Sequence, residues 1–215
     1  FQLTADAKWQ QIGRTHLSDG VALVSQQPLN TSFFSSAPGF AWVVAKLWQD
    51  LAFEDGPEIV ESIANAYEQV LAPKPAIGFD LINGLAGLTV FARIAPARHF
   101  QSIMDHVWRA LQDVALKTPG FGWVGVSNTM VDDTKADLGI AHGAPGILAG
   151  LSAALNQGWN CPQAEAAIGR GGLWLREKQI DVAGQAGYPY FVGENHLARL
   201  GWCYGMPSSA ICFAC

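Results

Sequence analysis

A chain of 215 residues is long enough for one domain with a sizeable hydrophobic core. Half of its residues are hydrophobic and only 14% are charged, which indicates extensive burial of helix against helix. The net charge of -5 gives no electrostatic reason to expect nucleic acid as a partner, and the longest uncharged stretches, residues 21–44 and 138–164, are too interrupted by Pro, Gly and polar residues to predict a membrane span.

Both ends of the sequence lack the usual signs of a natural terminus. The chain begins with Phe1, and its last apolar run, residues 211–215, has none of the residues that commonly stop a helix. We expect a single domain over residues 1–215, truncated at both ends. The four cysteines do not form a secreted disulfide framework and no signal peptide is visible. We therefore expect a cytoplasmic protein with at most a peripheral association at the inner face of the membrane.

A short signature of small residues recurs along the chain and leads into apolar runs. The copies are Ser36-Ala37-Pro38-Gly39, Gly84-Leu85-Ala86-Gly87, Gly143-Ala144-Pro145-Gly146 and Gly205-Met206-Pro207-Ser208, and their first residues are separated by 48, 59 and 62 positions. The runs at residues 40–48, 88–94 and 147–155 are apolar on nearly every face, which predicts buried helices. Pro suits the first turn of such a helix, and Gly lets backbones approach closely.

Segments of a second kind lie between these runs. Residues 58–71, 99–116 and, more weakly, 164–178 place apolar residues on one helical stripe, which predicts half-exposed outer helices. The alternation predicts an all-α fold of inner and outer helical hairpins, either an open solenoid or a closed α/α toroid. Residues 117–135 and 179–198 read as long irregular loops, each shortly before a signature, and loops of this length are often functional.

Residues that carry chemistry lie at or just before three of the predicted inner helices. Asp80 precedes the second signature, His142 the third, and Arg199, Cys203 and Tyr204 the fourth. If the repeats close round an axis, these five side chains converge on one mouth. A carboxylate, an imidazole, a guanidinium, a thiol and a phenol at one mouth are typical of an active site.

Each of the five also has a simpler interpretation. An Asp before a helix is usually an N-cap, and this alone explains Asp80. His142 and Cys203 suit an apolar core, Arg199 suits a solvated helix end, and Tyr204 suits a packed aromatic with one hydrogen bond. Their occurrence at equivalent positions of several repeats favours a shared site.

Three of these stretches resemble the lanthionine synthetase C family over most of the chain, from about residue 32 onward. The matching strings are Asp80-Leu81-Ile82-Asn83-Gly84-Leu85-Ala86-Gly87, Ala141-His142-Gly143-Ala144-Pro145-Gly146 and Trp202-Cys203-Tyr204-Gly205. The last string looks more like that of stand-alone cyclases than that of cyclase domains in bifunctional synthetases. The Ser residues at 36 and 208 depart from the Gly of the pattern, but both are small and we expect the packing to survive.

The resemblance implies an α/α toroid of seven inner and seven outer helices, of which about four hairpins would be present here. It also implies a zinc ion at the mouth, with Cys203 as the first ligand and two further ligands in a Cys-His-Gly string beyond Cys215. His142 matches the catalytic histidine of the family and Asp80 its active-site aspartate, while Arg199 and Tyr204 match the active-site residues beside the first ligand. Cys212 and Cys215 have zinc-like spacing, but we interpret them as buried helix residues.

The activity implied is the Michael addition of peptide Cys thiols to dehydroalanine or dehydrobutyrine, which forms thioether rings in lantibiotic-type peptides. The partners implied are a dehydrated precursor peptide and, in the same pathway, a dehydratase and an ABC-type exporter. The fragment alone is expected to be inactive, because most of its zinc ligands are missing.

Alternatives remain open at this point. A LanC-like protein that adds glutathione to dehydroamino acids would use the same residues, and a non-catalytic scaffold in a peptide-modification complex would share the architecture. An α/α-toroid glycosidase is disfavoured, because such enzymes use paired carboxylates and Asp80 has no evident acidic counterpart at the other signatures.

Overall fold

The structure is a computed structural model and describes residues 6–71, 78–115 and 136–214. Within these residues the chain forms helices and one short hairpin of strands. In chain order they are α1 (Ala7–Gln26), α2 (Ala37–Leu47), α3 (Gly56–Leu71), α4 (Leu85–Ala92), α5 (Ala97–Ala115), α6 (Ala144–Asn156), α7 (Pro162–Glu177), β1 (Ile180–Val182), β2 (Gln185–Gly187) and α8 (Gly205–Ala214).

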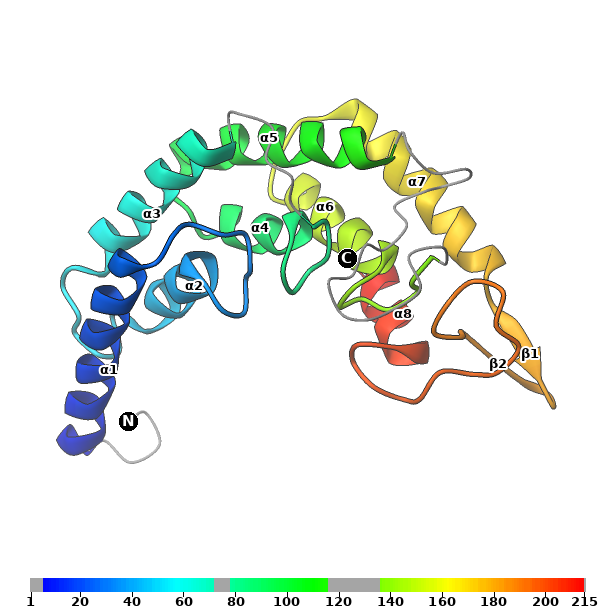
Figure 1. Ribbon diagram of the computed structural model, residues 1–215, viewed down its shortest axis with the longest axis horizontal. Helices are drawn as coiled ribbons and strands as arrows, with labels where there is room; N and C mark the ends of the chain where they lie inside the picture. The colour runs from blue at the N-terminus through cyan, green and yellow to red at the C-terminus, as the bar shows by residue number, and fades with distance from the viewer. Residues whose placement is uncertain (1–5, 72–77, 116–135, 215) are drawn as a thin grey trace.

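The helices form two concentric rows of an open arc (Figure 1). The inner row consists of α2, α4, α6 and α8, each in contact with the next, and the outer row consists of α3, α5 and α7. Each outer helix packs on the inner helix that precedes it, so the repeat unit is an inner–outer hairpin. This arrangement confirms the all-α prediction and the predicted order of inner and outer helices.

Two elements were not expected from the sequence. α1 begins at an N-cap, where the side chain of Asp6 accepts a hydrogen bond from the backbone N–H of Lys8. Among its residues only Leu17 is buried, so the helix carries too weak an apolar stripe to be recognised. The predicted loop at residues 179–198 contains the antiparallel pair β1 and β2, whereas the predicted functional loop at residues 117–135 lies outside the described residues.

The loop before each inner helix turns so tightly that a glycine at the helix start touches the chain six residues upstream. A Cβ added to Gly143 would lie 2.1 Å from the carbonyl oxygen of Asp137, and one added to Gly84 would lie 2.2 Å from the carbonyl oxygen of Gly78. Gly205 repeats this contact with Arg199 and also has a positive φ of 75°. The signature is therefore a requirement of the turn as well as of helix packing.

Hydrogen bonds join each of these loops to the loop of the neighbouring repeat. The backbone N–H of Phe33 donates to the carbonyl of Ile82 over 2.9 Å, and that of Leu81 donates to the carbonyl of Ala141 over 3.0 Å. At the third junction the backbone N–H of Ile140 donates to Oγ of Ser208, 2.7 Å away. The inner-helix starts are thus tied together along one rim of the arc.

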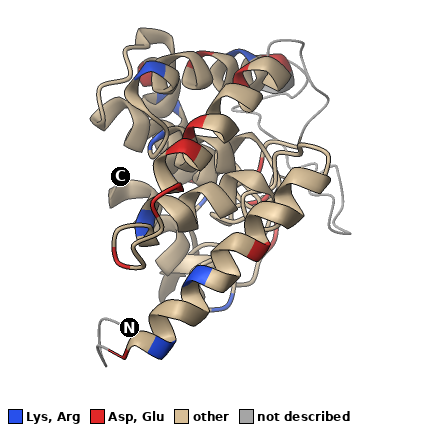
Figure 2. Cartoon of the chain, turned by 90° about the vertical axis from the view of Figure 1, so that its left-hand side faces the viewer, with Lys and Arg blue, Asp and Glu red and all other residues tan. Residues whose placement is uncertain are grey.

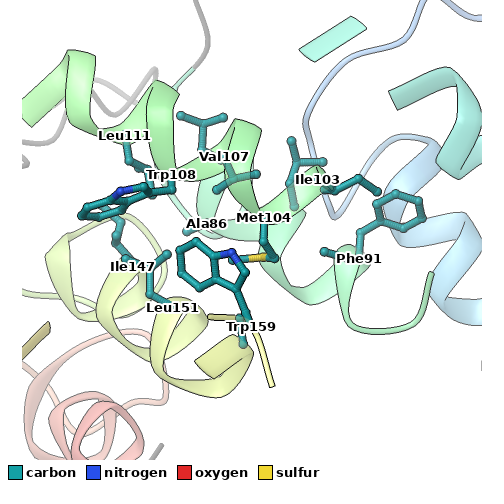
Figure 3. Close-up of a cluster of buried hydrophobic side chains, with 14 of the residues drawn as sticks. Ala86, Phe91, Ile103, Met104, Val107, Trp108, Leu111, Ile147, Leu151 and Trp159 are labelled. Carbon is teal, nitrogen blue, oxygen red and sulfur yellow. The ribbon is translucent and has the colours of Figure 1, made fainter. Parts of the chain in front are cut away.

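The core lies between the two rows, and one cluster of its buried side chains lies where α4, α5 and α6 meet (Figure 3). Met104 and Leu111 of α5 and Ile147 of α6 are fully buried there. Trp159, which follows α6, lies edge-on to Trp108 with ring centroids 6.4 Å apart. Its indole N–H donates to the carboxylate of Asp105 on α5, so the contact between the rows is polar as well as apolar.

The prediction that the inner helices are buried all round is correct for α4 and α6 and wrong for α2. Because α2 lies near one end of the inner row, Trp42 and Leu47 keep 37% and 39% of their surface exposed. α8, at the other end, exposes Ile211 and Phe213. The charged residues in the view from the α1 end are scattered over several helices and do not form a block of one sign (Figure 2). An inner helix is thus enclosed only where it has inner-row neighbours on both flanks.

No helix in the described part of the chain is long and apolar enough to span a membrane.

Replacing Ser208 with Ala in the full-length protein is expected to lower the free energy of unfolding by about 1–3 kcal/mol, because the buried N–H of Ile140 loses its acceptor. Ser209→Ala is the matched control. This neighbouring serine is also buried, but its hydroxyl binds only the carbonyl of Gly205 on its own helix. Urea unfolding measures both changes, and equal losses for the two variants would contradict a loop-joining role for Ser208.

Candidate active site

His142 and Asp80 are brought together from two different repeats. His142 lies in the loop before α6, and its Nδ1 is 3.0 Å from Oδ2 of Asp80 in the loop before α4. The Asp80 side chain is almost fully buried, whereas the imidazole keeps 20% of its surface exposed. The other carboxylate oxygen of Asp80 accepts the backbone N–H of Asn83. Because the N-cap of α4 is Gly84, Asp80 is not the helix cap that its position suggested.

This arrangement sets the charge of the imidazole. The hydrogen bond from Asp80 raises the pKa of His142 above its usual range, while partial burial acts in the opposite direction. The negative charges of Asp80 and Asp137 raise the pKa of His142 further. An imidazole oriented by a buried acid and exposed on its other side is suited to carry and release a proton.

The loop before α8 holds the other three predicted residues. Arg199 is exposed, and its Nη2 lies 3.8 Å from Sγ of Cys203, which is half-buried. The backbone N–H of Arg199 donates to the hydroxyl of Tyr190, 3.1 Å away. The ring of Tyr190 stands edge-on to the ring of Tyr204 at 5.0 Å. The thiol therefore has a guanidinium and two phenols in its surroundings.

Asp137 connects this loop to the loop of His142. It is buried, with 2% of its surface exposed, and Oδ2 accepts the hydroxyl of Tyr204 over 2.9 Å. Its Oδ1 accepts the backbone N–H of Gly139 over 2.6 Å. Burial raises the pKa of Asp137 and also that of Tyr204, and the negative charge of Asp137 raises the pKa of Tyr204 further.

The five candidate residues thus form two groups along the rim. Asp80 and His142 make one pair, and Arg199, Cys203 and Tyr204 make the other group. The hydrogen-bond partner of the His142 side chain is Asp80, and that of the Cys203 thiol is Arg199. The two groups approach through Gly139, because a Cβ on this residue would lie 2.5 Å from the carbonyl oxygen of Cys203. The roles of these residues stay predictions.

Among the described residues, no group of three or more His, Cys, Asp and Glu side chains is arranged to hold a metal ion. His142 is engaged with Asp80, so Cys203 remains as the candidate ligand in this part of the chain. Cys212 is buried in α8, as predicted, and Cys215 lies outside the described residues. The donor set that the structure describes is therefore incomplete for zinc, which needs four ligands.

Asp137 and Tyr190 were missed by the sequence analysis. A signal for Asp137 exists, because an Asp-Leu dipeptide precedes both signatures, Asp80-Leu81 by four residues and Asp137-Leu138 by six. A search for this dipeptide, and not an alignment of the repeats on their signatures, would have identified Asp137. Tyr190 had no such signal, because it reaches the site only through the pairing of residues 190–192 with residues 136–138.

Comparison with known proteins identifies the fold. The family model described as "Lanthionine synthetase C-like protein" matches residues 1–214. Among solved structures, a chain described as "Nisin cyclase" superposes with a TM-score of 0.77 at 19% sequence identity and covers 93% of this chain. This chain spans 56% of the length of that cyclase. No curated protein sequence matches the chain. The fold is therefore an incomplete α/α toroid, as predicted.

Replacing Asp80 with Asn in the full-length protein is expected to lower the pKa of His142, because a neutral amide replaces the charged acceptor of its hydrogen bond and the negative charge is lost. In the wild type, the charged imidazole contributes stability that is fully present below the unfolded-state pKa of about 6.5. This contribution is lost as the pH rises through the higher folded-state pKa of His142. The free energy of unfolding should therefore depend less on pH across this window in the variant.

NMR titration of the imidazole carbons measures the pKa of His142 directly, and urea unfolding at several pH values measures its linkage to stability. His99, which contacts Glu61 and Glu68 of α3, serves as an internal reference whose titration the substitution should leave unchanged. An unaltered His142 titration in Asp80→Asn would show that the acid does not control the imidazole.

Proposed function

The chain belongs to the lanthionine synthetase C-like protein family, and from this premise we propose that it is the front part of a lanthionine cyclase. The observation that carries this proposal is the Asp80–His142 pair at 3.0 Å, on the same rim as the Arg199–Cys203 contact at 3.8 Å. The pair supplies a proton carrier, and the second group supplies a thiol ligand beside a cation. Both are what addition of a thiol to a dehydrated residue requires.

The proposed reaction is a Michael addition within one peptide. The sulfur of a peptide Cys bonds to the β-carbon of dehydroalanine or dehydrobutyrine, and the carbon–carbon double bond opens to an enolate. The thiol proton leaves before attack, because the thiolate is the nucleophile. A proton then returns to the α-carbon, so no atom is gained or lost and a thioether ring results.

His142 is the proposed proton carrier. It is the partly exposed member of its pair, so substrate can reach the ring face that Asp80 leaves free. The raised pKa keeps the imidazole protonated over more of the neutral range, which favours donation of a proton to the enolate carbon. Asp80 fixes the ring through Nδ1, which leaves Nε2 to exchange the proton.

Arg199 is the proposed stabiliser of the enolate oxygen. Its guanidinium is exposed at the rim and carries a fixed positive charge near the sulfur of Cys203. Tyr204, the other candidate, donates its hydroxyl hydrogen to Asp137, so this hydrogen is not directed at the enolate. Positive charge placed before the reaction is effective at stabilising such an oxyanion.

Zinc is the proposed cofactor, with Cys203 as one ligand. The half-buried Cys203 thiol beside a guanidinium suits a thiolate ligand. The remaining protein ligands would come from a part of the full-length protein outside these 215 residues. Bound zinc would supply a Lewis acid that converts the incoming peptide thiol to a thiolate at neutral pH.

The proposed substrate is a dehydrated precursor peptide. A dehydratase must act earlier in the same pathway, because Ser and Thr side chains become acceptors for thiols only after loss of water. An ABC-type exporter for the cyclised peptide completes the proposed set of partners. Assignment to one precursor requires the peptide itself.

In the full-length protein, His142→Ala is expected to bind zinc normally and to slow ring formation by about a hundredfold to ten-thousandfold, because the proton carrier is removed while Cys203 stays. Metal analysis gives the zinc content. Mass spectrometry after alkylation of unreacted peptide thiols counts the rings that have formed.

Cys203→Ala is the paired variant and should lose both zinc and cyclisation. Retained ring formation by His142→Ala would remove this histidine from the mechanism. Addition of glutathione to a Cys-free dehydrated peptide, without ring formation in the Cys-containing one, would assign the protein to glutathione addition rather than to ring formation.

A further inference from the structure

Asp137 is a buried acid whose two oxygens serve different loops of the rim. Oδ1 accepts the backbone N–H of Gly139, two residues away in the loop of His142. Oδ2 accepts the hydroxyl of Tyr204, 67 positions along the chain in the loop of Cys203. Its backbone also pairs with Phe191 in an isolated antiparallel bridge. The carboxylate is therefore fixed from both sides.

Gly139 makes room for this contact. A Cβ at Gly139 would lie 2.6 Å from Cε1 of the Tyr204 ring, so a larger residue would displace the phenol from Asp137. The same loop therefore supplies both the acceptor for the hydroxyl and the space for the ring. The His142 loop thus holds Tyr204 in two ways, through the acceptor Asp137 and through the space beside Gly139.

The contact repeats a relation seen one repeat earlier. Asp80, in the loop before α4, binds a backbone N–H of its own loop and His142 of the next loop. Asp137, in the loop before α6, binds a backbone N–H of its own loop and Tyr204 of the next. Each acid therefore holds a side chain from the following repeat.

We propose that Asp137 is a positioning residue, which holds Tyr204 and with it the loop of Arg199 and Cys203 in register with His142. This inference rests on the proposed cyclase function. Because Tyr204 donates its hydroxyl hydrogen to Oδ2 of Asp137, this hydrogen is directed toward Asp137 and not toward the mouth. His142 binds Asp80 through Nδ1, which leaves Nε2 to donate. His142 is then the group that returns the proton to the enolate.

The test is a double-mutant cycle in the full-length zinc-loaded protein, with Asp137→Ala, Tyr204→Phe and the double variant. Each single substitution is expected to lower kcat for ring formation about tenfold to a hundredfold, because a hydrogen bond to a buried charge is lost, with little change in KM or zinc content. The double variant should be no worse than the poorer single variant. Losses that multiply would overturn the proposal.

Asp105→Ala is the control, because Asp105 also accepts a hydrogen bond from an aromatic side chain, the indole N–H of Trp159, but lies on the outer helix α5. It should leave kcat unchanged. A fall in kcat equal to that of Asp137→Ala would mean that loss of any such acid disturbs the fold, and would overturn the positioning role.

Hydrogen–deuterium exchange of residues 199–205 separates this inference from the proposed function. In the metal-free protein, exchange there should accelerate to a similar extent in Asp137→Ala and Tyr204→Phe, and not in Asp105→Ala. If the wild type forms no rings but this pattern holds, the cyclase proposal fails and Asp137 still positions the loop. If rings form but exchange in Asp137→Ala matches the wild type, the positioning role fails.

Discussion

The site depends on hydrogen bonds that join the loop of each inner helix to the loop of the next. Leu81 reaches Ala141 through backbone groups, and Ile140 reaches the hydroxyl of Ser208. These bonds set the spacing between neighbouring loops at the rim. The apolar core between the two rows sets the spacing between neighbouring helices. Without them the candidate residues would lie on separate hairpins with only apolar packing, which is not directional, to align them. With them, Asp80 lies 3.0 Å from an imidazole 62 positions away.

The chemical groups also satisfy the needs of a buried rim. Asp80 and Asp137 are both nearly inaccessible, and a buried carboxylate is costly unless donors surround it. Each acid receives one backbone N–H from its own loop and one side-chain donor from the next repeat. The pairing therefore offsets desolvation, orients the imidazole or the phenol, and ties neighbouring repeats together. One interaction serves both the fold and the proposed chemistry.

The sequence predicted the helical rows because their signals are local. Small residues and Pro mark where α6 begins, and the apolar stripe of α5 marks its buried face. α1 was not predicted, because a helix with one buried residue carries little periodic signal. At the site, the helix starts were predictable, but the partner of each side chain was not. Asp137 is brought to Tyr204 by the pairing of residues 136–138 with residues 190–192, and no local sequence pattern predicts this pairing.

The apolar side chains exposed at the two ends of the arc are explained by the number of neighbours that each inner helix has. A central helix such as α4 contacts α2 and α6 within the row and α5 outside it, so nearly all of its residues are buried. α2 and α8 have the same apolar character but lack a second inner-row neighbour among the described residues, and Trp42 and Phe213 stay exposed. Exposure at the ends is therefore a matter of position in the row, not of a different kind of helix. The junctions at the rim have both of their partners, because the contacts of Asp80 with His142 and of Asp137 with Tyr204 both lie within the described arc. The proposed proton carrier and its supporting acids thus all lie within the part of the chain that the structure describes, whereas only one of the proposed metal ligands, Cys203, does.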